Sequence, residues 1–508
     1  MTKDSGFKHE NLVSKRADAR TFTHFSSSGT EGAPPGFKPH PKPLALHWGM
    51  PNAGFFPIDS IDVNLVEYPF QKSLSIPITN ASVESFFPDE KSTTGKNTVT
   101  INKVDDSKYL DITTALQYGP VAGLSPLLQF TEDFITRVHK PAYEGWGTII
   151  TNGAGDGLNK VADALLDPGD VILLEEFTFV PFLKNIENSG GIPVPIKLNL
   201  DQESGKELGL DLDYLTNLLE NWKTEKPGLP SPKALYVIPT GQNPTGTTQS
   251  VETRKKVYAL AEKYDFAIIE DDPYGYLSLQ PWQKPANTFK LNDFLEVDDY
   301  IANHITPSYL TIDTSGRVLR IETFSKLFAP GLRLGFIVAH KRFTKVIENY
   351  SNVVTRSSSG TSQLIVQNVI AKKFGGVDGW LQWILKMRVT YSHRRDLLLN
   401  QLFESEAYKK GYLGVIDPTA GMFASVFIKF PEGVDAQAKL QLLNFKFQNF
   451  GVGVVLGANM AVDRKFSEER ATFYRLTFAP ANNDQEIIEA GKRFVDAVED
   501  FFAKGLEY

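Results

Sequence analysis

Residues 322–335 read Glu-Thr-Phe-Ser-Lys-Leu-Phe-Ala-Pro-Gly-Leu-Arg-Leu-Gly, and β-rich runs precede and follow them. The stretch places Lys326 just after a predicted strand and beside two hydroxyl side chains, Thr323 and Ser325, with Arg333 seven positions further on. A neutral lysine amine can form a Schiff base with an aldehyde. Hydroxyls and an arginine can hold a phosphate beside it. Taken alone, the stretch also fits an ordinary surface turn between two strands, because short motifs match by chance.

The composition is that of a globular protein. The chain has 508 residues, enough for two or three domains, of which 42% are hydrophobic and 22% charged. The formal net charge is -7, which argues against a general nucleic-acid binder. The absence of cysteine excludes disulfides, thiolate zinc sites and a cysteine nucleophile. We expect no metal site and no nucleic-acid partner.

The sequence shows no sign of a membrane or secretory destination. Its charged N-terminus lacks the apolar region of a signal peptide. No apolar run approaches the length of a membrane span, and the last four residues are not a retention signal. We therefore expect a cytoplasmic protein without a membrane partner.

From about residue 145, short β-rich runs alternate with amphipathic stretches, which predicts an α/β fold. Helical patterns occur between several of the runs, for example at 157–166 and 251–264. This alternation predicts a mostly parallel sheet covered by helices on both faces. The predicted strands are 148–152, 171–175, 192–196, 234–238, 266–270, 318–323 and 334–339.

After about residue 345 the pattern becomes helical, with a long predicted helix at 379–403 and then three short strand patterns of a smaller α+β unit. Those strands are predicted at 426–428, 452–455 and 473–478. Residues 26–43 are rich in Ser, Gly and Pro, and 88–108 are polar and expected to be a loop. The predicted organisation is an irregular arm (1–43), a segment that packs on the small domain (44–108), a large domain (109–345) and a small domain (346–508).

Ligands of open α/β sheets bind at the carboxyl ends of the strands, so the residues that follow each predicted strand are candidates for a site. The first strand ends in the glycine-rich stretch 151–157, where the amides near Ala154 and Gly155 could approach a phosphate. Phe179 follows the next strand and could stack on a flat heterocycle. Each also fits a simpler role, as a glycine turn or a core aromatic.

Two further strand ends carry polar side chains. Asn243 lies in an Asn-Pro turn and could donate to a phenolate oxygen. Asp271 directly follows a strand, and a carboxylate that faces a pyridine nitrogen stabilises its protonated form. Tyr274 could donate to the same ring oxygen. Alone these are also typical of a turn and a helix N-cap. Together with Lys326 they match each part of one molecule, pyridoxal 5′-phosphate (PLP).

With these motifs in this order, the chain resembles a class I, fold-type I PLP-dependent aminotransferase, from about Leu44 to the C-terminus. Within that class it looks closest to fungal aromatic aminotransferase II, in the kynurenine/α-aminoadipate branch. The resemblance is carried by 47–51 with 56–57, 115–118, 175–179, 270–277, 360–363, 420–423 and 454–457. It implies a large domain with a mostly parallel mixed sheet between helices, and a smaller α+β domain.

The resemblance also implies roles by position. Lys326 would carry PLP and then act as the general base, while Asp271 would pair with the pyridine nitrogen. Arg475 would bind the substrate carboxylate, and Tyr118 would reach the phosphate of a neighbouring subunit, which implies a homodimer with shared sites. The other implied cofactor residues are Ala154, Gly155, Phe179, Asn243, Tyr274, Thr323, Ser325 and Arg333, and the other implied substrate residues are Asn243 and Gly49.

The activity that the resemblance implies is transamination of Phe, Tyr or Trp with a 2-oxo acid, by a ping-pong mechanism. Three alternatives stay open: a 2-aminoadipate, kynurenine or broad-specificity transaminase, a PLP lyase or decarboxylase, and a transcription regulator with an aminotransferase-like domain. The regulator would need a basic helix-turn-helix ahead of the domain, and the first hundred residues are instead rich in Pro and Gly.

Overall fold

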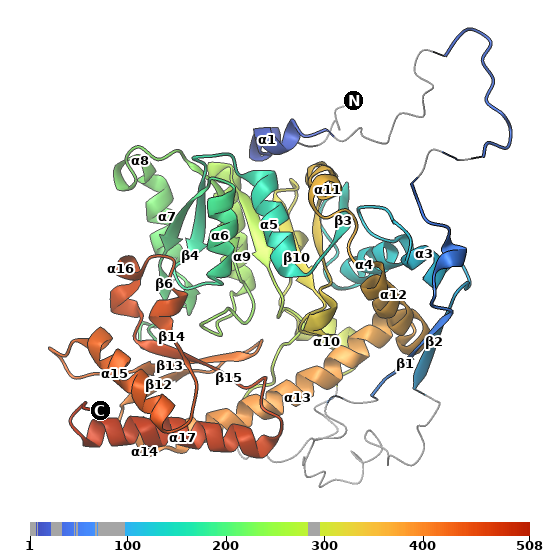
Figure 1. The fold of residues 1–508 in the computed structure, drawn as a ribbon. Helices are drawn as coiled ribbons and strands as arrows, with labels where there is room; N and C mark the ends of the chain where they lie inside the picture. Colours follow the sequence, from blue (N-terminus) through green and yellow to red (C-terminus); the bar gives the residue numbers. More distant parts are fainter. Residues whose placement is uncertain are drawn as a thin grey trace.

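Two sheets of different size organise the chain (Figure 1). The computed structural model describes residues 7, 9–21, 33–44, 46, 49–66, 69, 97–282 and 295–508. The larger sheet has seven strands and the smaller has four. No helix in the described part of the chain has the length and apolar character needed to span a bilayer.

The large sheet is mixed and mostly parallel, as the alternating pattern predicts. Its spatial order is β3 (Trp146–Thr151), β11 (Gly335–His340), β10 (Val318–Thr323), β9 (Ala267–Asp271), β8 (Pro232–Val237), β4 (Val171–Glu175) and β5 (Ile192–Ile196). β11 runs antiparallel to both of its neighbours, and the other pairs are parallel. Lys326 therefore lies in the connection between the adjacent antiparallel strands β10 and β11.

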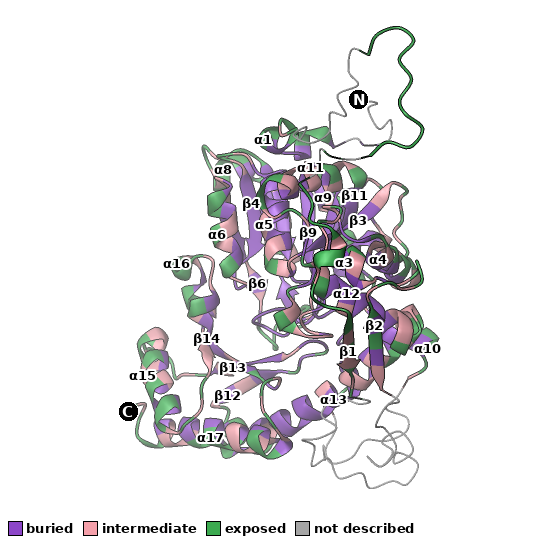
Figure 2. Ribbon diagram, turned by 45° about the vertical axis from the view of Figure 1, so that its right-hand side comes forward, coloured by how far each residue is buried: buried purple, intermediate pink, exposed green. Residues whose placement is uncertain are grey.

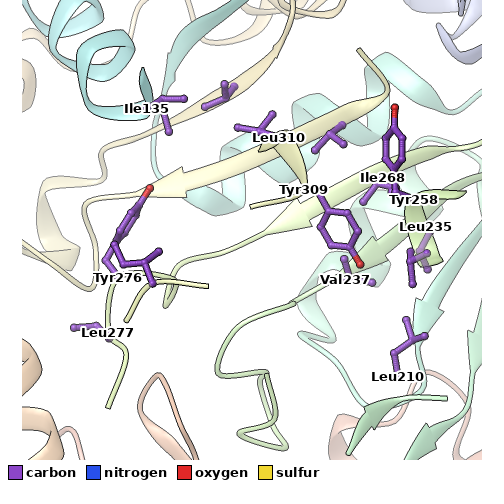
Figure 3. Close-up of a cluster of buried hydrophobic side chains, with 14 of the residues drawn as sticks. Ile135, Leu210, Leu235, Val237, Tyr258, Ile268, Tyr276, Leu277, Tyr309 and Leu310 are labelled. Carbon is purple, nitrogen blue, oxygen red and sulfur yellow. The ribbon is translucent and has the colours of Figure 1, made fainter. Parts of the chain in front are cut away.

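Helices cover both faces of the large sheet, so its central strands are buried throughout (Figure 2). One face packs against α5 (Ala154–Leu165), α6 (Pro181–Asn188) and α11 (Lys341–Val354). The other packs against α4 (Ser125–Val138), α7 (Leu212–Glu220) and α9 (Val251–Tyr264). Along each strand, alternate residues enter the two cores because successive side chains point to opposite faces. In Figure 3, for example, Leu235 and Val237 lie in the α4/α7/α9 core with Tyr309.

The small sheet is antiparallel, in the order β12 (Leu413–Ile416), β13 (Phe423–Ile428), β15 (Phe473–Thr477) and β14 (Val455–Leu456). It packs against α15 (Ala436–Asn449) and α17 (Asp484–Ala503). The helix α13 (Val377–Glu404) connects the two cores: Trp380 near its start is buried in the large core, and Leu402 near its end is buried in the small one. The sequence pattern does not predict strand β12.

The N-terminal region contains more regular structure than the sequence predicts. The sequence predicts a loop at 88–108, of which 88–96 lie outside the described residues. Thr98–Asn102 instead forms strand β2, which pairs antiparallel with β1 (Ser60–Asn64). The reason is alternation, because Val99 and Ile101 are buried with Leu364 of α12 (Gly360–Asn368) while Thr100 and Asn102 stay exposed.

The start of the described chain also packs on the helices that cover the large sheet. The short helix α1 (Lys15–Asp18) packs on α5 and α11, with Ala17 buried. Arg16 and Arg20 both pair with the buried Asp163 of α5. The arm predicted as irregular is therefore docked at 9–20, whereas 33–44 has no helix or strand.

The remaining elements are short connections. They are η1 (Glu10–Leu12), η2 (Ala53–Phe55), α3 (Ile112–Ala115), β6 (Leu198–Asn199), β7 (Gly209–Leu210), α8 (Trp222–Glu225), α10 (Val297–Asn303), η5 (Tyr309–Thr311), η6 (Pro330–Leu332), η7 (Val369–Phe374), α14 (Glu406–Lys409), η8 (Gly457–Met460), α16 (Arg464–Ser467) and η9 (Glu468–Arg470).

Candidate active site

A cavity of about 240 Å³ lies where the strands of the large sheet end, and its walls follow the carboxyl ends of β3, β4, β8, β9 and β10. This is the edge at which ligands of open α/β sheets bind. The sequence-predicted residues that line the cavity are Ala154, Gly155, Phe179, Asn243, Asp271, Tyr274, Thr323, Ser325, Lys326 and Arg333. Residues more than 170 positions apart in the chain thus meet in one small space.

Lys326 is partly buried in this cavity. Burial lowers the pKa of its amine, nearby Arg333 and Arg475 lower it further, and Asp271 opposes them. A lowered pKa increases the fraction of neutral amine, which is the form that attacks an aldehyde. The surroundings of Lys326 therefore favour nucleophilic chemistry at its Nζ atom.

Asp271 is buried at the end of β9 and has one engaged and one free oxygen. Its Oδ2 atom accepts a 2.6 Å hydrogen bond from the hydroxyl of Tyr236, and its Oδ1 atom is buried without a hydrogen-bond partner. Burial raises the pKa of Asp271 to about 7, while the Tyr236 hydrogen bond lowers it. A buried carboxylate oxygen without a partner is costly. A protonated pyridine nitrogen in the cavity would supply the partner that Oδ1 lacks.

The other end of the cavity gathers groups that can bind a phosphate. Helix α5 begins at Ala154, and the first amides of a helix have no partner within the helix. Gly153 before it has φ +83°, and a Cβ there would come within 2.6 Å of Nη2 of Arg333. Thr323 donates a 2.9 Å hydrogen bond to the hydroxyl of Ser325, which in turn lies 3.5 Å from Nη1 of Arg333. Amides, hydroxyls and a guanidinium thus converge, as the predicted phosphate site requires.

Asn243 and Tyr274 provide donors between these two ends. The Oδ1 atom of Asn243 accepts a 2.7 Å hydrogen bond from Nη1 of Arg475, so its Nδ2 group is the part free to donate into the cavity. Burial, followed by the charge of Asp271, raises the pKa of Tyr274 above its ordinary value. Its hydroxyl therefore stays protonated and can donate to a ring oxygen. Phe179 supplies an aromatic wall.

Arg475 does not line this cavity but joins it through Asn243. It lies on β15 of the small sheet, and its guanidinium carbon is 4.5 Å from the centroid of the Phe423 ring. Its Nε atom is buried without a hydrogen-bond partner. An arginine that rests on an aromatic ring and keeps a free donor is suited to bind a carboxylate.

Two predicted site residues are not brought to the cavity. Tyr118 is 66% exposed, and Gly49 is so open that a Cβ added to it would meet no described atom within 4 Å. The segments that contain Tyr118 and Gly49 contact each other, because the Nε2 atom of Gln117 donates a 2.7 Å hydrogen bond to the carbonyl of Pro51. Residues 47 and 48 of the same motif lie outside the described residues.

Sequence reasoning missed several residues around the site. Tyr236 is not among the predicted residues, although it lies on β8 beside the strand that ends in Asp271. Behind Asp271, the wholly buried Arg320 contacts three carboxylates, and its charge lowers the pKa of Asp271. Those carboxylates belong to Glu270, Asp272 and Glu322. The cavity is completed by Leu158, Ile238, Pro273 and Pro330.

The cavity therefore fits PLP by its own chemistry. It offers an amine for an aldehyde, a buried unpartnered carboxylate oxygen for a ring nitrogen, donors for a ring oxygen and a cationic, amide-lined end for a phosphate. Each group was predicted for that role from its place after a strand, and the structure brings them to one edge of the sheet.

Comparison with known proteins is consistent with this geometry. The profile of the family "Aminotransferase class I and II" matches residues 90–492. Aromatic amino acid aminotransferase 2 of Saccharomyces cerevisiae is 38% identical over 487 residues, which cover 90% of each chain. The structure of the aromatic aminotransferase Aro9 from C. albicans is 57% identical and superposes with a TM-score of 0.88, covering 98% of this chain and 99% of that one.

A more distant structure extends the likeness beyond fungi. A kynurenine aminotransferase from Pyrococcus horikoshii, solved in complex with PMP, is 25% identical and superposes with a TM-score of 0.62 over 76% of this chain and 83% of that one. The family profile covers most of the chain, and the relatives match it nearly end to end. The chain belongs to the class I and II aminotransferases.

Proposed function

We propose that the protein is an aromatic amino acid transaminase, which moves the amino group of Phe, Tyr or Trp to a 2-oxo acid. The observation that carries this is the cavity in which Lys326, Asp271 and Asn243 meet, with Arg475 bound to Asn243. The aromatic preference rests on the similarity to enzymes named aromatic aminotransferases in S. cerevisiae and C. albicans.

The cofactor is pyridoxal 5′-phosphate, which when bound supplies an aldehyde that takes up the amino group and a ring that accepts electrons. The residues around it have separable tasks. Lys326 would hold the aldehyde, and as a free amine it would act as the base that moves the proton of the substrate Cα. Asp271 holds the proton on the ring nitrogen. Arg333, Ser325 and Thr323 hold the phosphate.

The substrate is oriented from the other sheet. Arg475 binds the α-carboxylate by two parallel hydrogen bonds, and its free Nε group is one of the donors available for that contact. A fixed carboxylate would orient the substrate Cα–H bond towards the cavity that Lys326 lines. Tyr274 and Asn243 would donate to the ring oxygen of the cofactor, and Phe179 would pack against its ring. Gly49 would close the substrate site from the N-terminal segment.

We further propose that the protein acts as a homodimer in the cytoplasm. Among the described residues, the stretch 37–66 exposes apolar side chains that a lone subunit leaves unburied, and Tyr118 is exposed beside it. Exposed apolar side chains of this kind are often covered at an interface, and a partner would bring Tyr118 to the neighbouring phosphate site. The exposed apolar residues are Phe37, Leu44, Leu46, Met50, Phe55, Ile58 and Val66.

The same proposal assigns the parts of the chain. Residues 109–345 form the cofactor-binding large domain and 346–508 the small domain, with 44–108 packed against the small domain and 1–43 as an arm. Burial of Val99 and Ile101 against Leu364 supports the contact between 44–108 and the C-terminal part.

A half-reaction panel tests the proposed activity. Purified holoenzyme is mixed with single amino acids, and the visible absorbance of the bound cofactor is followed without any 2-oxo acid. We expect bleaching with Phe, Tyr and Trp, and recovery when a 2-oxo acid is added. Equal turnover of 2-aminoadipate and phenylalanine would contradict the proposed preference for aromatic amino acids. Release of ammonia or carbon dioxide without a 2-oxo acid would indicate a lyase or a decarboxylase instead.

Complementation tests the shared sites. A mixture of the Lys326→Ala and Tyr118→Phe proteins, unfolded and refolded together, would form hybrid dimers in which one site is intact. We expect such a mixture to be more active than either protein alone. Activity that equals the sum of the two parents would contradict shared sites.

A further inference from the structure

Tyr236 is a buried tyrosine that touches a cofactor residue without touching the cofactor cavity. It is the last but one residue of β8, its side chain is wholly buried, and it is absent from the cavity wall. Its hydroxyl donates a 2.6 Å hydrogen bond to Oδ2 of Asp271. Its ring packs against that of Phe182 of α6, with the centroids 4.6 Å apart. Both ends of the side chain are therefore fixed.

The strand register explains how the two side chains meet. β8 and β9 are parallel, and Tyr236 pairs with Ile269, two residues before Asp271. Residues 269 and 271 share one face of the sheet because side chains alternate along a strand. Tyr236 lies on that face too, in the same core as Ile269. The long tyrosine side chain then spans the two-residue offset to reach the carboxylate.

Because of this hydrogen bond, the two oxygens of Asp271 differ in whether they have a partner. Oδ2 is engaged by Tyr236, and Oδ1 is left as the buried oxygen without a partner. A carboxylate anchored at one oxygen cannot rotate freely, so the other oxygen keeps one direction. Burial and the charge of Asp271 raise the pKa of Tyr236, so its hydroxyl remains a donor. The donor also opposes burial by favouring the ionised carboxylate.

We propose that Tyr236 is a positioning residue, which holds the carboxylate of Asp271 ionised and aimed at the ring nitrogen of the cofactor. This rests on the proposed function, because it presumes that Asp271 faces that nitrogen. Tyr236 acts only through Asp271 and makes no contact with the substrate or the cofactor. The charged or titratable groups that face Asp271 are Tyr236 from β8, Asp272 and Tyr274 after β9, Arg320 from β10 and Lys326 before β11.

The test replaces the hydroxyl alone, with Tyr236→Phe, and uses readouts other than activity. The first is the affinity of the apoprotein for PLP, which we expect to weaken about tenfold, since the hydrogen bond to a charged group is lost. The second is the pH midpoint of the visible absorbance change of the holoenzyme, which reports titration of the Lys326 nitrogen. A weaker charge on the ring raises that midpoint, and we expect a shift of about half a pH unit.

Steady-state kinetics add a third readout. We expect kcat to fall about tenfold with KM for phenylalanine nearly unchanged, because the lost interaction serves proton removal and not substrate binding. The matched control is Tyr258→Phe on α9, a buried tyrosine whose hydroxyl donates a 3.0 Å hydrogen bond to Asp313 away from the cavity. This control should lose stability but leave PLP affinity and the pH midpoint unchanged.

A double-mutant cycle tests whether Tyr236 acts through Asp271. In an Asp271→Asn background, Tyr236→Phe should produce no further shift of the pH midpoint, because the carboxylate through which it acts is gone. Equal shifts with and without Asp271, or an unchanged PLP affinity and midpoint in Tyr236→Phe, would overturn the inference. A wild-type protein that binds no PLP would instead overturn the proposed function, so the two failures are distinguishable.

Discussion

Nη1 of Arg475 donates a 2.7 Å hydrogen bond to Oδ1 of Asn243, which joins the small sheet to the cofactor edge of the large sheet. The bond has a double effect. It directs the amide donor of Asn243 towards the cavity, and it holds the guanidinium beside the cavity before any substrate arrives. The group proposed to bind the substrate and a group proposed to bind the cofactor are thus oriented by each other.

Substitution of Arg475 tests the carboxylate site. Arg475→Lys keeps the charge but loses the planar pair of donors, so we expect kcat/KM for phenylalanine to fall about 100-fold, mainly through KM. Steady-state kinetics measure this, and the control is the visible absorbance of the cofactor bound to Lys326, which the substitution should not abolish. An unchanged KM would mean that another group binds the carboxylate.

Substitution of Lys326 tests the centre of the site. Lys326→Ala removes both the amine that binds PLP and the general base, which alone contributes about 10²–10⁴-fold. We expect loss of turnover and loss of the visible absorbance of the covalently bound cofactor. Turnover at the wild-type rate would show that the assignment is wrong.

The lowered pKa of Lys326 predicts a pH dependence for assembly of the holoenzyme. Only the neutral amine attacks the aldehyde, so the rate of PLP incorporation into apoprotein should rise with pH. Because the folded pKa is lowered, the rise should be centred at a lower pH than for free Nα-acetyl-lysine with PLP. Stopped-flow absorbance measures both reactions. Coinciding midpoints would contradict the environment described for Lys326.

The raised pKa of Asp271 predicts a pH dependence of apoprotein stability. Burial raises this pKa to about 7, so between about pH 4 and 7 the folded state binds more protons than the unfolded state. The free energy of unfolding from this group therefore falls as pH rises through that window. Asp271→Asn removes the effect, and we expect its apoprotein to melt roughly 2 °C higher than wild type at pH 8 but not at pH 4. The control substitution Asp496→Asn, at an exposed position, should change the melting temperature at neither pH.

The buried ion pair between Glu176, which follows β4 of the large sheet, and Arg470, which precedes β15 of the small sheet, should contribute strongly to stability. Glu176 is wholly buried, and both its oxygens accept hydrogen bonds from Arg470, at 2.7 and 2.8 Å. Arg470→Ala would leave the carboxylate buried without its cation, which costs about 3 kcal/mol. The control is Lys429→Ala, which breaks the exposed pair with Glu203 and should cost less than about 1 kcal/mol. Denaturant unfolding measures the free energy of unfolding of both variants. Equal losses in Arg470→Ala and Lys429→Ala would contradict the importance of burial for the pair with Glu176.

Local patterns were enough to predict the large sheet. The bounds of β4, β5 and β10 agree with the predicted runs 171–175, 192–196 and 318–323, and each of these runs begins directly after a glycine or a charged residue. The small sheet was harder. β12 (Leu413–Ile416) contains a glycine and only four residues, so it gives no clear period, and the two-residue β14 overlaps the predicted run 452–455 only at Val455.

Some residues of the candidate site could likewise be predicted from local patterns, and others could not. Residues at or shortly after strand ends, such as Asp271 and Lys326, could be predicted from topology, since parallel strands bring their carboxyl ends to one edge. Tyr236 could not be singled out, because a tyrosine within a strand looks like any core residue until the register with β9 is known. Arg475 needed the family resemblance, because its partner Asn243 lies 232 residues earlier in the chain.

The proposed cofactor contacts and the proposed substrate contact come from different sheets, and this separation affects the catalytic cycle. The predicted cofactor contacts within one subunit come from residues 154–333 of the large sheet, while the predicted carboxylate-binding arginine comes from β15 of the small one. In a ping-pong reaction two different acids must enter and leave in turn while the cofactor stays. A molecule built in this way can exchange one acid for the next at the small sheet without loosening the large sheet's hold on the cofactor.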